Sequence, residues 1–274
     1  MDKIRNGALK GAIVGDIVGS IFEHNNIKSK LFPFFGPGCR FTDDTVCTVA
    51  VASVFTDGWD EVKDGGDYIE HLYLPLRNRL LNYGQAYPHA GYGRGYKNWL
   101  REPDPRPYAS AGNGAPMRCS AAGCVTDDPR EAMGLGVFTC MPTHNHPGSA
   151  VAAGLVAELI CLARNGASME KLREEAEEYY AIPKLDELRP HYRFHVSSRG
   201  TMPAALAAFF ESRSFEDAVR NAVSLGGDSD TLAAITGSIA EAFWGVPDEI
   251  WDSAKNYLDA GLLEEVERFY RKFR

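Results

Sequence analysis

A chain of 274 residues with 45% apolar and 24% charged residues has the size and composition of a soluble globular protein with one large domain or two. Its formal net charge of −8 argues against non-specific nucleic-acid binding, which normally requires a basic surface, and no stretch approaches the ~20 apolar residues of a membrane span. The six cysteines form no C-x-x-C pair and lie mostly in apolar runs. We therefore expect buried, reduced thiols and a cytoplasmic protein.

The first predicted helix covers residues 4–23. Its glycines recur at every fourth position (7, 11, 15 and 19) and therefore line one face of the helix. A glycine inside a helix costs ~1 kcal/mol relative to alanine, so we expect this face to touch the backbone of another helix in the protein interior. Asp16 and Glu23 are polar exceptions in this helix. Asp16 fits a structural carboxylate and a site residue equally well, whereas the polar residues after Glu23 favour a site residue there.

Two short acidic segments precede apolar helices. The first is Thr42-Asp43-Asp44-Thr45, which follows a loop at residues 31–41 and opens a helix that we expect to end near residues 57–58. The second is Gly226-Gly227-Asp228-Ser229-Asp230-Thr231, which contains no lysine or arginine and opens a helix to Trp244. A capping role alone requires only one side-chain oxygen at a helix start. We therefore expect the two helix starts to meet at one shared cation site.

Carboxylate and hydroxyl oxygens select hard cations such as Mg²⁺, Mn²⁺ or Ca²⁺ over zinc. Neighbouring carboxylates such as Asp43 and Asp44 diverge by ~100° on a helix and can therefore serve two ions. With Asp228 and Asp230 opposite them, the predicted site has enough oxygen ligands for a pair of divalent ions. Helix capping is the simpler interpretation of either segment taken by itself.

The segment from residue 83 to residue 118 is rich in glycine, proline and tyrosine, which predicts a long loop. Loops of this length are usually functional or disordered. This one ends in a turn of small residues, the 110–114 turn, which comprises Ser110, Ala111, Gly112, Asn113 and Gly114. Its backbone N–H groups could approach a phosphate closely, although a purely structural loop fits equally well.

The rest of the chain indicates helices with short connections. We expect helices at residues 59–81 (interrupted at Gly65-Gly66 and Pro75), 129–141, 148–164, 168–180, 201–211, 214–225 and 247–258, with an irregular segment at 182–199 and an amphipathic tail. His144 precedes one of these helices. With only His146 nearby, it is more typical of a local hydrogen-bonding residue than of a zinc ligand. Because no segment shows sustained period-two alternation, an all-α fold is predicted.

Five motifs occur in order along the chain: Gly15-Asp16-x-x-Gly19 with Glu23, Thr42-Asp43-Asp44-Thr45, Gly112-Asn113-Gly114-x-x-Met117-Arg118, Thr143-His144, and Gly226-Gly227-Asp228-Ser229-Asp230-Thr231. Their combination resembles the ADP-ribosylglycohydrolase family, which includes the dinitrogenase reductase-activating glycohydrolases. The resemblance covers nearly the whole chain and implies a single compact, orthogonal all-α domain over residues 1–274. It also implies two Mg²⁺ or Mn²⁺ ions and the release of ADP-ribose from a modified protein or small molecule.

The resemblance further implies a role for each motif residue. The metal ligands would be Thr42, Asp43, Asp44, Asp228, Asp230 and Thr231, with Asp44 also acting in catalysis and Asp43 also contacting the substrate. Glu23 would be a ligand, a gate or a water-activating carboxylate at the edge of the metal centre. The 110–114 turn, including Ser110, Ala111, Gly112, Asn113 and Gly114, would hold the diphosphate. His144 would approach the distal part of the nucleotide.

Ala111 departs from the family pattern, because some relatives carry an aromatic residue there that can stack on adenine. In this chain Tyr92, Tyr96 or Tyr108 would take that role, or the natural ligand differs from protein-linked ADP-ribose. Two other functions stay open, namely a catalytically silent nucleotide-binding relative and a metal-assisted nucleotide phosphoesterase. The released product distinguishes them, and the sequence leaves the acceptor, the linkage and the oligomeric state open.

Overall fold

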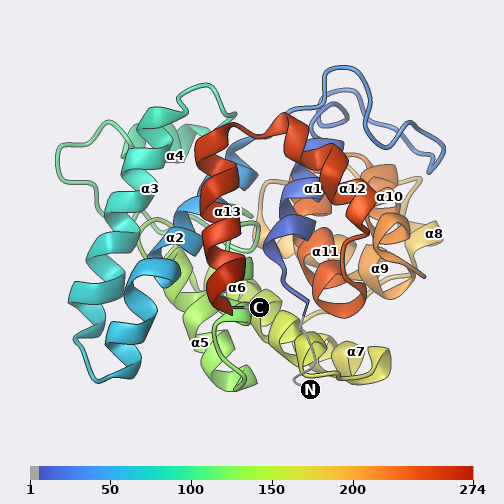
Figure 1. Cartoon of the computed structure of the whole chain (residues 1–274). Coiled ribbons are helices and arrows are strands. Elements are labelled where there is room, and N and C mark those ends of the chain that lie inside the picture. The colour runs from blue at the N-terminus through green and yellow to red at the C-terminus, as the bar shows by residue number, and fades with distance from the viewer. Residues whose placement is uncertain (1–5, 274) are drawn as a thin grey trace.

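The computed structural model describes residues 6–273, and within that range the protein is all-α, as predicted (Figure 1). Its helices surround one continuous hydrophobic core, and no strand occurs among the described residues. The α-helices are α1 (Leu9–Gly19), α2 (Asp43–Lys63), α3 (Leu74–Ala86), α4 (Arg94–Trp99), α5 (Pro129–Cys140), α6 (Pro147–Arg164), α7 (Met169–Glu177), α8 (Leu185–Leu188), α9 (Ser198–Phe210), α10 (Phe215–Leu225), α11 (Ser229–Trp244), α12 (Asp248–Ala254) and α13 (Ala260–Phe273).

Helices α1 and α11 lie side by side with their backbones in direct contact (Figure 1). An added Cβ atom at Gly11 or Gly15 would lie 2.0 Å from a backbone carbonyl oxygen of α11, and one at Gly19 would lie 2.5 Å from the Cα atom of Asp230. Because interiors are close-packed, no side chain fits at these distances. The predicted glycine face therefore touches another helix at Gly11, Gly15 and Gly19, whereas Gly7 lies before α1 and an added Cβ atom there would lie 2.3 Å from the Tyr270 ring.

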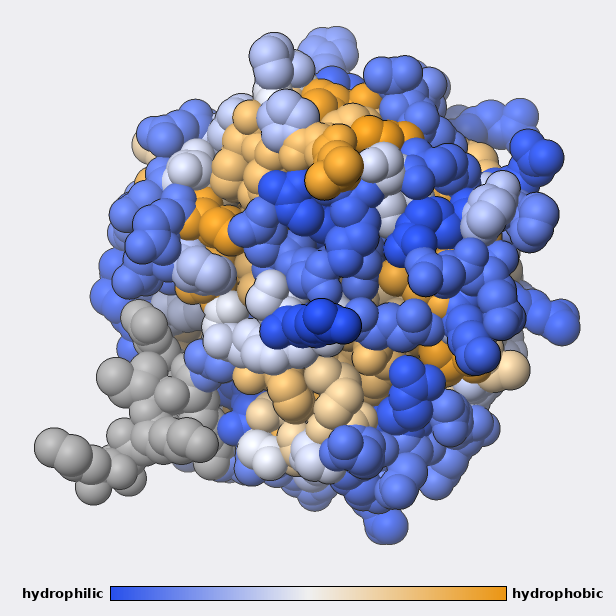
Figure 2. All heavy atoms as spheres, turned by 90° about the vertical axis from the view of Figure 1, so that its right-hand side faces the viewer, coloured by the Kyte–Doolittle hydropathy of each residue, from blue (hydrophilic) through white to orange (hydrophobic). Residues whose placement is uncertain are grey.

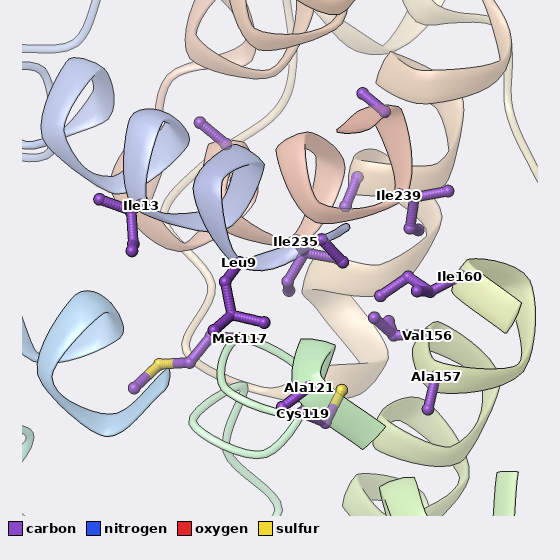
Figure 3. Close-up of a cluster of buried hydrophobic side chains, with 14 of the residues drawn as sticks. Leu9, Ile13, Met117, Cys119, Ala121, Val156, Ala157, Ile160, Ile235 and Ile239 are labelled. Atoms are coloured by element: carbon purple, nitrogen blue, oxygen red, sulfur yellow. The ribbon is translucent and has the colours of Figure 1, made fainter. Parts of the chain in front are cut away.

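The core extends from this helix pair to α6 and to the segment before α5. The labelled members of the cluster are Leu9, Ile13, Met117, Cys119, Ala121, Val156, Ala157, Ile160, Ile235 and Ile239 (Figure 3). By length and apolar composition α6 could cross a membrane, contrary to the expectation that no stretch approaches this length, but 67% of it is buried inside the protein. It therefore serves as a core helix here. All six cysteines are buried.

Helix α2 is longer than predicted, because it continues through Gly58 to Lys63. A Cβ atom at Gly58 would lie 2.2 Å from the backbone oxygen of His71, so this glycine permits a close contact and does not end the helix. The break follows instead at Gly65, whose φ of 95° suits glycine. A single π-helical turn, Ile69–Tyr73, then leads into α3.

Several other elements also differ from the predicted ones, among them the first helix, the long loop and α9. Helix α1 is shorter than residues 4–23: residues 4 and 5 lie outside the described residues, and residues 20–22 form a turn after the helix. The predicted loop at 83–118 contains α4. Helix α9 begins at Ser198, before the expected residue 201, because the side chain of Ser197 accepts a hydrogen bond from the Gly200 N–H and caps the helix.

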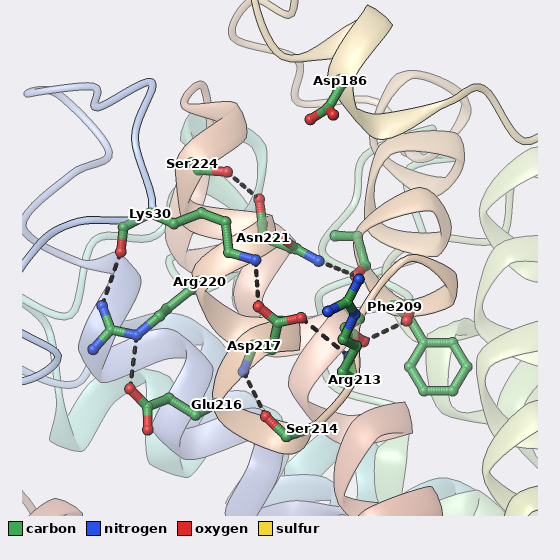
Figure 4. Close-up of polar contacts among 12 residues, drawn as sticks. Lys30, Asp186, Phe209, Arg213, Ser214, Glu216, Asp217, Arg220, Asn221 and Ser224 are labelled. Carbon is green, nitrogen blue, oxygen red and sulfur yellow. Dashed lines mark hydrogen bonds and ion pairs between the residues drawn. The ribbon is translucent and has the colours of Figure 1, made fainter.

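The loop that precedes α2 is attached to α10 (Figure 4). Lys30 pairs with Asp217, and the guanidinium of Arg220 donates to the carbonyl oxygens of Lys30 at 3.0 Å and of Phe32 at 2.8 Å. These contacts fix the path by which the chain arrives at Thr42. Hydrophilic side chains predominate on the face shown in Figure 2, with apolar areas between them.

Candidate active site

The buried carboxylate of Asp16 on α1 holds the start of α2 in place. Its oxygens accept hydrogen bonds from the backbone N–H of Thr42 at 2.8 Å and from its hydroxyl at 2.6 Å. They also accept from the backbone N–H of Thr45 at 3.1 Å and from the Thr45 hydroxyl. Since the same helix contacts the start of α11 at Gly19, α1 brings both acidic helix starts together.

The two helix starts meet as expected. Asp16, Asp44 and Asp230 each offer a carboxylate oxygen within 4.8 Å of the other two. Glu23, Asp228 and Asp230 form a second such group. We call these five residues the acidic cluster; Asp230 belongs to both groups and therefore lies between two potential ion positions.

Two further predicted ligands lie at the same place. The hydroxyl of Thr231 donates to Asp44 Oδ2 at 3.2 Å, and Thr42 is held by Asp16. Asp43 lies in neither group of the acidic cluster, although it lines the adjoining cavity. Neighbouring carboxylates at a helix start diverge, and of these two the structure brings Asp44, but not Asp43, into a group of possible metal ligands among the described residues.

The acidic cluster is electrostatically unfavourable by itself. Burial raises the pKa of Asp44 and of Asp230 well above the ordinary range, and the carboxylates of Asp230 and Asp228 respectively raise them further. Burial and the nearby Asp16 carboxylate raise the pKa of Asp43 to about 8. Asp44 Oδ1 is buried and has no hydrogen-bond partner within the described part of the chain. A hard divalent cation would satisfy that oxygen and offset the repulsion, so these residues could hold a metal.

Four residues of the acidic cluster, Glu23, Asp44, Asp228 and Asp230, line a cavity of about 380 Å³, which is large enough for a small ligand. Residues of the 110–114 turn, Tyr108, Arg118 and His144 line the same cavity. The lining therefore combines carboxylates with a guanidinium and with backbone groups of the turn. Such a cavity suits a ligand that is bound both through cations and through its own anionic groups.

The residues of the 110–114 turn have different surroundings. Ser110, Gly112, Asn113 and Gly114 line the cavity, whereas Ala111 is exposed and is not among the lining residues. The side-chain amide of Asn113 donates to Asp228 Oδ2 at 2.7 Å. This side chain therefore connects the turn to the acidic cluster and positions Asp228.

His144 lies against the same turn. Its Nδ1 atom is 2.7 Å from the Thr143 hydroxyl oxygen, and burial, together with the positive charge of Arg118, lowers its pKa to about 3. The imidazole is therefore neutral at physiological pH, and it can act as a hydrogen-bonding group but not as a cation.

The family pattern of the ADP-ribosylglycohydrolases matches residues 1–274. The chain belongs to the ADP-ribosylglycohydrolase family. Membership makes this protein a hydrolase, and the acidic cluster with its adjoining cavity is the candidate active site of this ADP-ribosylglycohydrolase.

Named relatives are similar over most of their length. The chain is 29% identical to the ADP-ribosyl-[dinitrogen reductase] glycohydrolase of Rhodospirillum rubrum, over 96% of this chain and 92% of that protein. It is 28% identical to the ADP-ribosylarginine hydrolase Tri1 of Pseudomonas putida, over 88% of this chain and 70% of that protein. A solved structure described as an ADP-ribosylglycohydrolase-related protein complex matches with a TM-score of 0.68 and 26% identity, over 98% of this chain and 97% of that chain.

The three candidate stacking tyrosines of this ADP-ribosylglycohydrolase differ in accessibility. Tyr92 is buried against Tyr96, with ring centroids 5.1 Å apart, and the Tyr96 hydroxyl donates to the backbone oxygen of Leu80 at 3.0 Å. Tyr108 is 37% exposed and lines the cavity, with its ring centroid 5.9 Å from that of His144. Tyr108 is therefore the one of the three whose ring is available for stacking.

Sequence reasoning missed several residues at this site. Asp16 was left undecided, and its role depends on the distant Thr42. Phe194 and Val196 are exposed and line the cavity, yet they come from the segment that the sequence marks only as irregular. Arg118 was part of a motif, but only the fold reveals its complete burial.

Proposed function

We propose that this protein is a metal-dependent hydrolase that cleaves the glycosidic bond between ADP-ribose and a modified acceptor and releases ADP-ribose. The observation that carries the proposal is the position of Asp230, which belongs to two groups of carboxylates whose oxygens lie within 4.8 Å of one another. We infer that two Mg²⁺ or Mn²⁺ ions bind there, because oxygen ligands favour hard cations. Their ligands would be Thr42, Asp43, Asp44, Asp228, Asp230 and Thr231.

The chemistry that bound ions supply is polarisation of the ribose hydroxyl groups and of water. Glu23 would accept a proton from the attacking water, because its side chain is 25% exposed at the edge of the acidic cluster and because burial raises its pKa toward the working range of a general base. Asp44, with a carboxylate oxygen that lacks a hydrogen-bond partner among the described residues, would orient the reacting groups. The negative charge of the cluster would stabilise an oxocarbenium-like transition state.

We infer that an ADP-ribosylated arginine is the first acceptor to test. Two relatives support this choice by their names, which specify dinitrogen reductase and ADP-ribosylarginine. An arginine acceptor makes the cleaved bond N-glycosidic. The burial of all six cysteines supports a reducing compartment such as the cytoplasm.

The test is to incubate the protein with ADP-ribosylated arginine and ADP-ribosylated serine peptides, with Mg²⁺, with Mn²⁺ or with a chelator. We expect free ADP-ribose from the arginine substrate and only in the presence of a divalent ion. Inorganic phosphate or AMP as the product would identify a phosphoesterase instead. No release from any substrate would favour a silent binding protein.

Two variants test the metal ligands directly. Asp43→Ala and Asp228→Ala are expected to lower turnover at least about 100-fold while the helical circular dichroism spectrum stays unchanged. Glu158→Gln is the matched control, because Glu158 is a buried carboxylate on α6 that does not line the cavity. Near-normal turnover by either alanine variant with added Mg²⁺ or Mn²⁺ would contradict the assignment.

A further inference from the structure

Arg118 is completely buried at the cavity and has no carboxylate partner among the described residues. One guanidinium nitrogen, Nη2, donates to the hydroxyl oxygen of Thr143 at 2.7 Å and to the backbone oxygen of Thr139 at 3.3 Å. The Nε atom is buried and has no hydrogen-bond partner among residues 6–273, although the Cys47 thiol lies next to the guanidinium. A buried charge in this state is unusual and requires an explanation.

The contact with Thr143 determines the direction of the next hydrogen bond. An arginine can only donate, so the Thr143 oxygen accepts from Arg118. Thr143 is fully buried, and among the described residues the acceptor recorded for its own hydroxyl hydrogen is Nδ1 of His144, at 2.7 Å. If Nδ1 carried the proton instead, that hydroxyl hydrogen would be left unsatisfied, which costs roughly 1–3 kcal/mol. The chain of donors therefore runs from Arg118 through Thr143 to His144.

We propose that Arg118 and Thr143 are positioning residues that hold His144 as a neutral imidazole with its proton on Nε2, so that Nε2–H donates a hydrogen bond to an oxygen of the bound ADP-ribose group. The identity of that ligand rests on the proposed function, whereas the tautomer of His144 does not. In this relay of hydrogen bonds from Arg118 through Thr143, His144 binds the ligand and transfers no proton.

The position of Nε2 supports the proposal. This atom would lie 3.2 Å from a Cβ atom at Gly112 and 2.9 Å from one at Gly114. The two glycines therefore let the Nε2 edge of the ring lie directly against the 110–114 turn. The backbone N–H of Gly114, which lines the cavity, donates to no backbone acceptor among the described residues. Hydrogen-bond donors without acceptors thus gather here, which fits the acceptor oxygens of a diphosphate or of its adjoining ribose.

The surroundings also disfavour the doubly protonated ring. Burial and the Arg118 charge lower the pKa of His144 to about 3, and an imidazolium could not accept the Thr143 hydroxyl hydrogen. The Tyr108 ring next to His144 carries no charge that would reverse this preference.

The first test is a two-bond ¹H–¹⁵N correlation spectrum of the full chain labelled at histidine. His144 is assigned among the seven histidines by its loss in His144→Gln. We expect a protonated Nε2 and an unprotonated Nδ1 at pH 7. An imidazolium, or a proton on Nδ1, would overturn the proposal.

The second test compares Thr143→Val, which keeps the shape of the side chain, with Thr143→Ser, which keeps the hydroxyl. We expect a mixture of tautomers in the valine variant and one tautomer in the serine variant. Affinity for ADP-ribose should fall about tenfold for valine, the effect of one lost ligand hydrogen bond, and stay within twofold for serine. Equal spectra and equal affinities for both variants would overturn the relay. If the wild type binds no ADP-ribose while its Nε2–H tautomer is present, the proposed function fails and the relay stands.

If Thr143→Val does not fold, the wild-type spectrum and Thr143→Ser still decide the matter. A serine variant that loses the single tautomer would contradict a role for the hydroxyl.

Discussion

Asp16 and Thr42 are joined by two hydrogen bonds, from the backbone N–H of Thr42 at 2.8 Å and from its hydroxyl at 2.6 Å, each to a different oxygen of Asp16. Because the Thr42 hydroxyl donates its hydrogen to Asp16, its oxygen lone pairs remain available to a cation. Both oxygens of Asp16 already accept hydrogen bonds, so Asp16 is better placed to orient metal ligands than to be one.

Asp16→Asn should therefore weaken metal binding without removing any predicted ligand. The amide presents a donor toward the N–H and hydroxyl groups that the carboxylate now accepts from. We expect Mn²⁺ affinity, measured by isothermal titration calorimetry, to fall about 10- to 100-fold, with turnover reduced in parallel. Glu158→Gln should bind Mn²⁺ as the wild type does. An Asp16→Asn affinity within twofold of the wild type would show that Asp16 is a bystander.

Gly15→Ala should destabilise the fold, because the new methyl group would lie 2.0 Å from the backbone oxygen of Ala233. Overpacking of this kind costs about 1–3 kcal/mol or more in the free energy of unfolding, which urea denaturation can measure. Gly134→Ala is the matched control, since Gly134 is in the exposed part of α5 with no atom near the added Cβ. It should raise the free energy of unfolding by up to about 1 kcal/mol. Equal effects of the two changes would contradict the described contact between α1 and α11.

Asp230→Asn should have opposite effects on stability with and without metal. Burial and repulsion raise the pKa of Asp230, so above the ordinary pKa of an aspartate its ionised form destabilises the metal-free fold. The amide removes that repulsion, and the melting temperature in chelator should rise. With Mn²⁺ at 100 times its dissociation constant, the wild type should gain about 2.7 kcal/mol and the variant little. A variant that melts lower than the wild type in chelator would contradict this electrostatic account.

His144 should contribute to acid denaturation. Its folded pKa of about 3 lies below the ordinary value of 6.5, so the unfolded chain binds a proton between these values that the folded protein does not. The contribution of neutral His144 to the free energy of unfolding is therefore fully present above pH 6.5. Below pH 6.5 this contribution falls by about 1.4 kcal/mol per pH unit. Urea denaturation at pH 6 and at pH 4 should show a loss about 3 kcal/mol smaller in His144→Gln. Identical losses in the two proteins would mean that His144 titrates normally.

Tyr108→Ala should weaken ADP-ribose binding about tenfold or more, because stacking on a base contributes roughly 1–3 kcal/mol. Tyr108→Phe retains the ring and should bind as the wild type does. Binding of ribose 5-phosphate, which has no base, should be the same for all three proteins. If Tyr108→Ala binds ADP-ribose normally, another group faces the adenine.

The fold class could be predicted from the sequence because its signals are local. Glycines at every fourth position predicted the contact between α1 and another helix, and it exists at Gly11, Gly15 and Gly19. The prediction that α2 ends near Gly58 was wrong, because the role of this glycine depends on a contact that is distant in the sequence. A glycine that ends a helix and one that admits a neighbouring backbone look alike in sequence, and only the distant His71 distinguishes them.

The meeting of the two acidic helix starts was predictable because each segment has more oxygen atoms than capping requires. The residues that surround and position the acidic cluster could not be predicted from the sequence. Asp16, Asn113 and Arg118 owe their roles to partners 26, 115 and 25 residues away, namely Thr42, Asp228 and Thr143. No periodicity or spacing within one segment specifies such pairs.

The direct backbone contact between α1 and α11 also limits how far these two helices can move relative to each other. Two helices that touch backbone to backbone at Gly11, Gly15 and Gly19 cannot slide past each other by a fraction of a turn without a collision, since no flexible side chain separates them. Asp16 on α1 and Asp228 and Asp230 at the start of α11 are carried by this pair, and the hydrogen bonds from Thr42 to Asp16 tie the start of α2, with Asp44, to it. The spacing of these carboxylates is therefore set by contacts of the main chain, and we expect substrate access to depend on the loops that line the cavity.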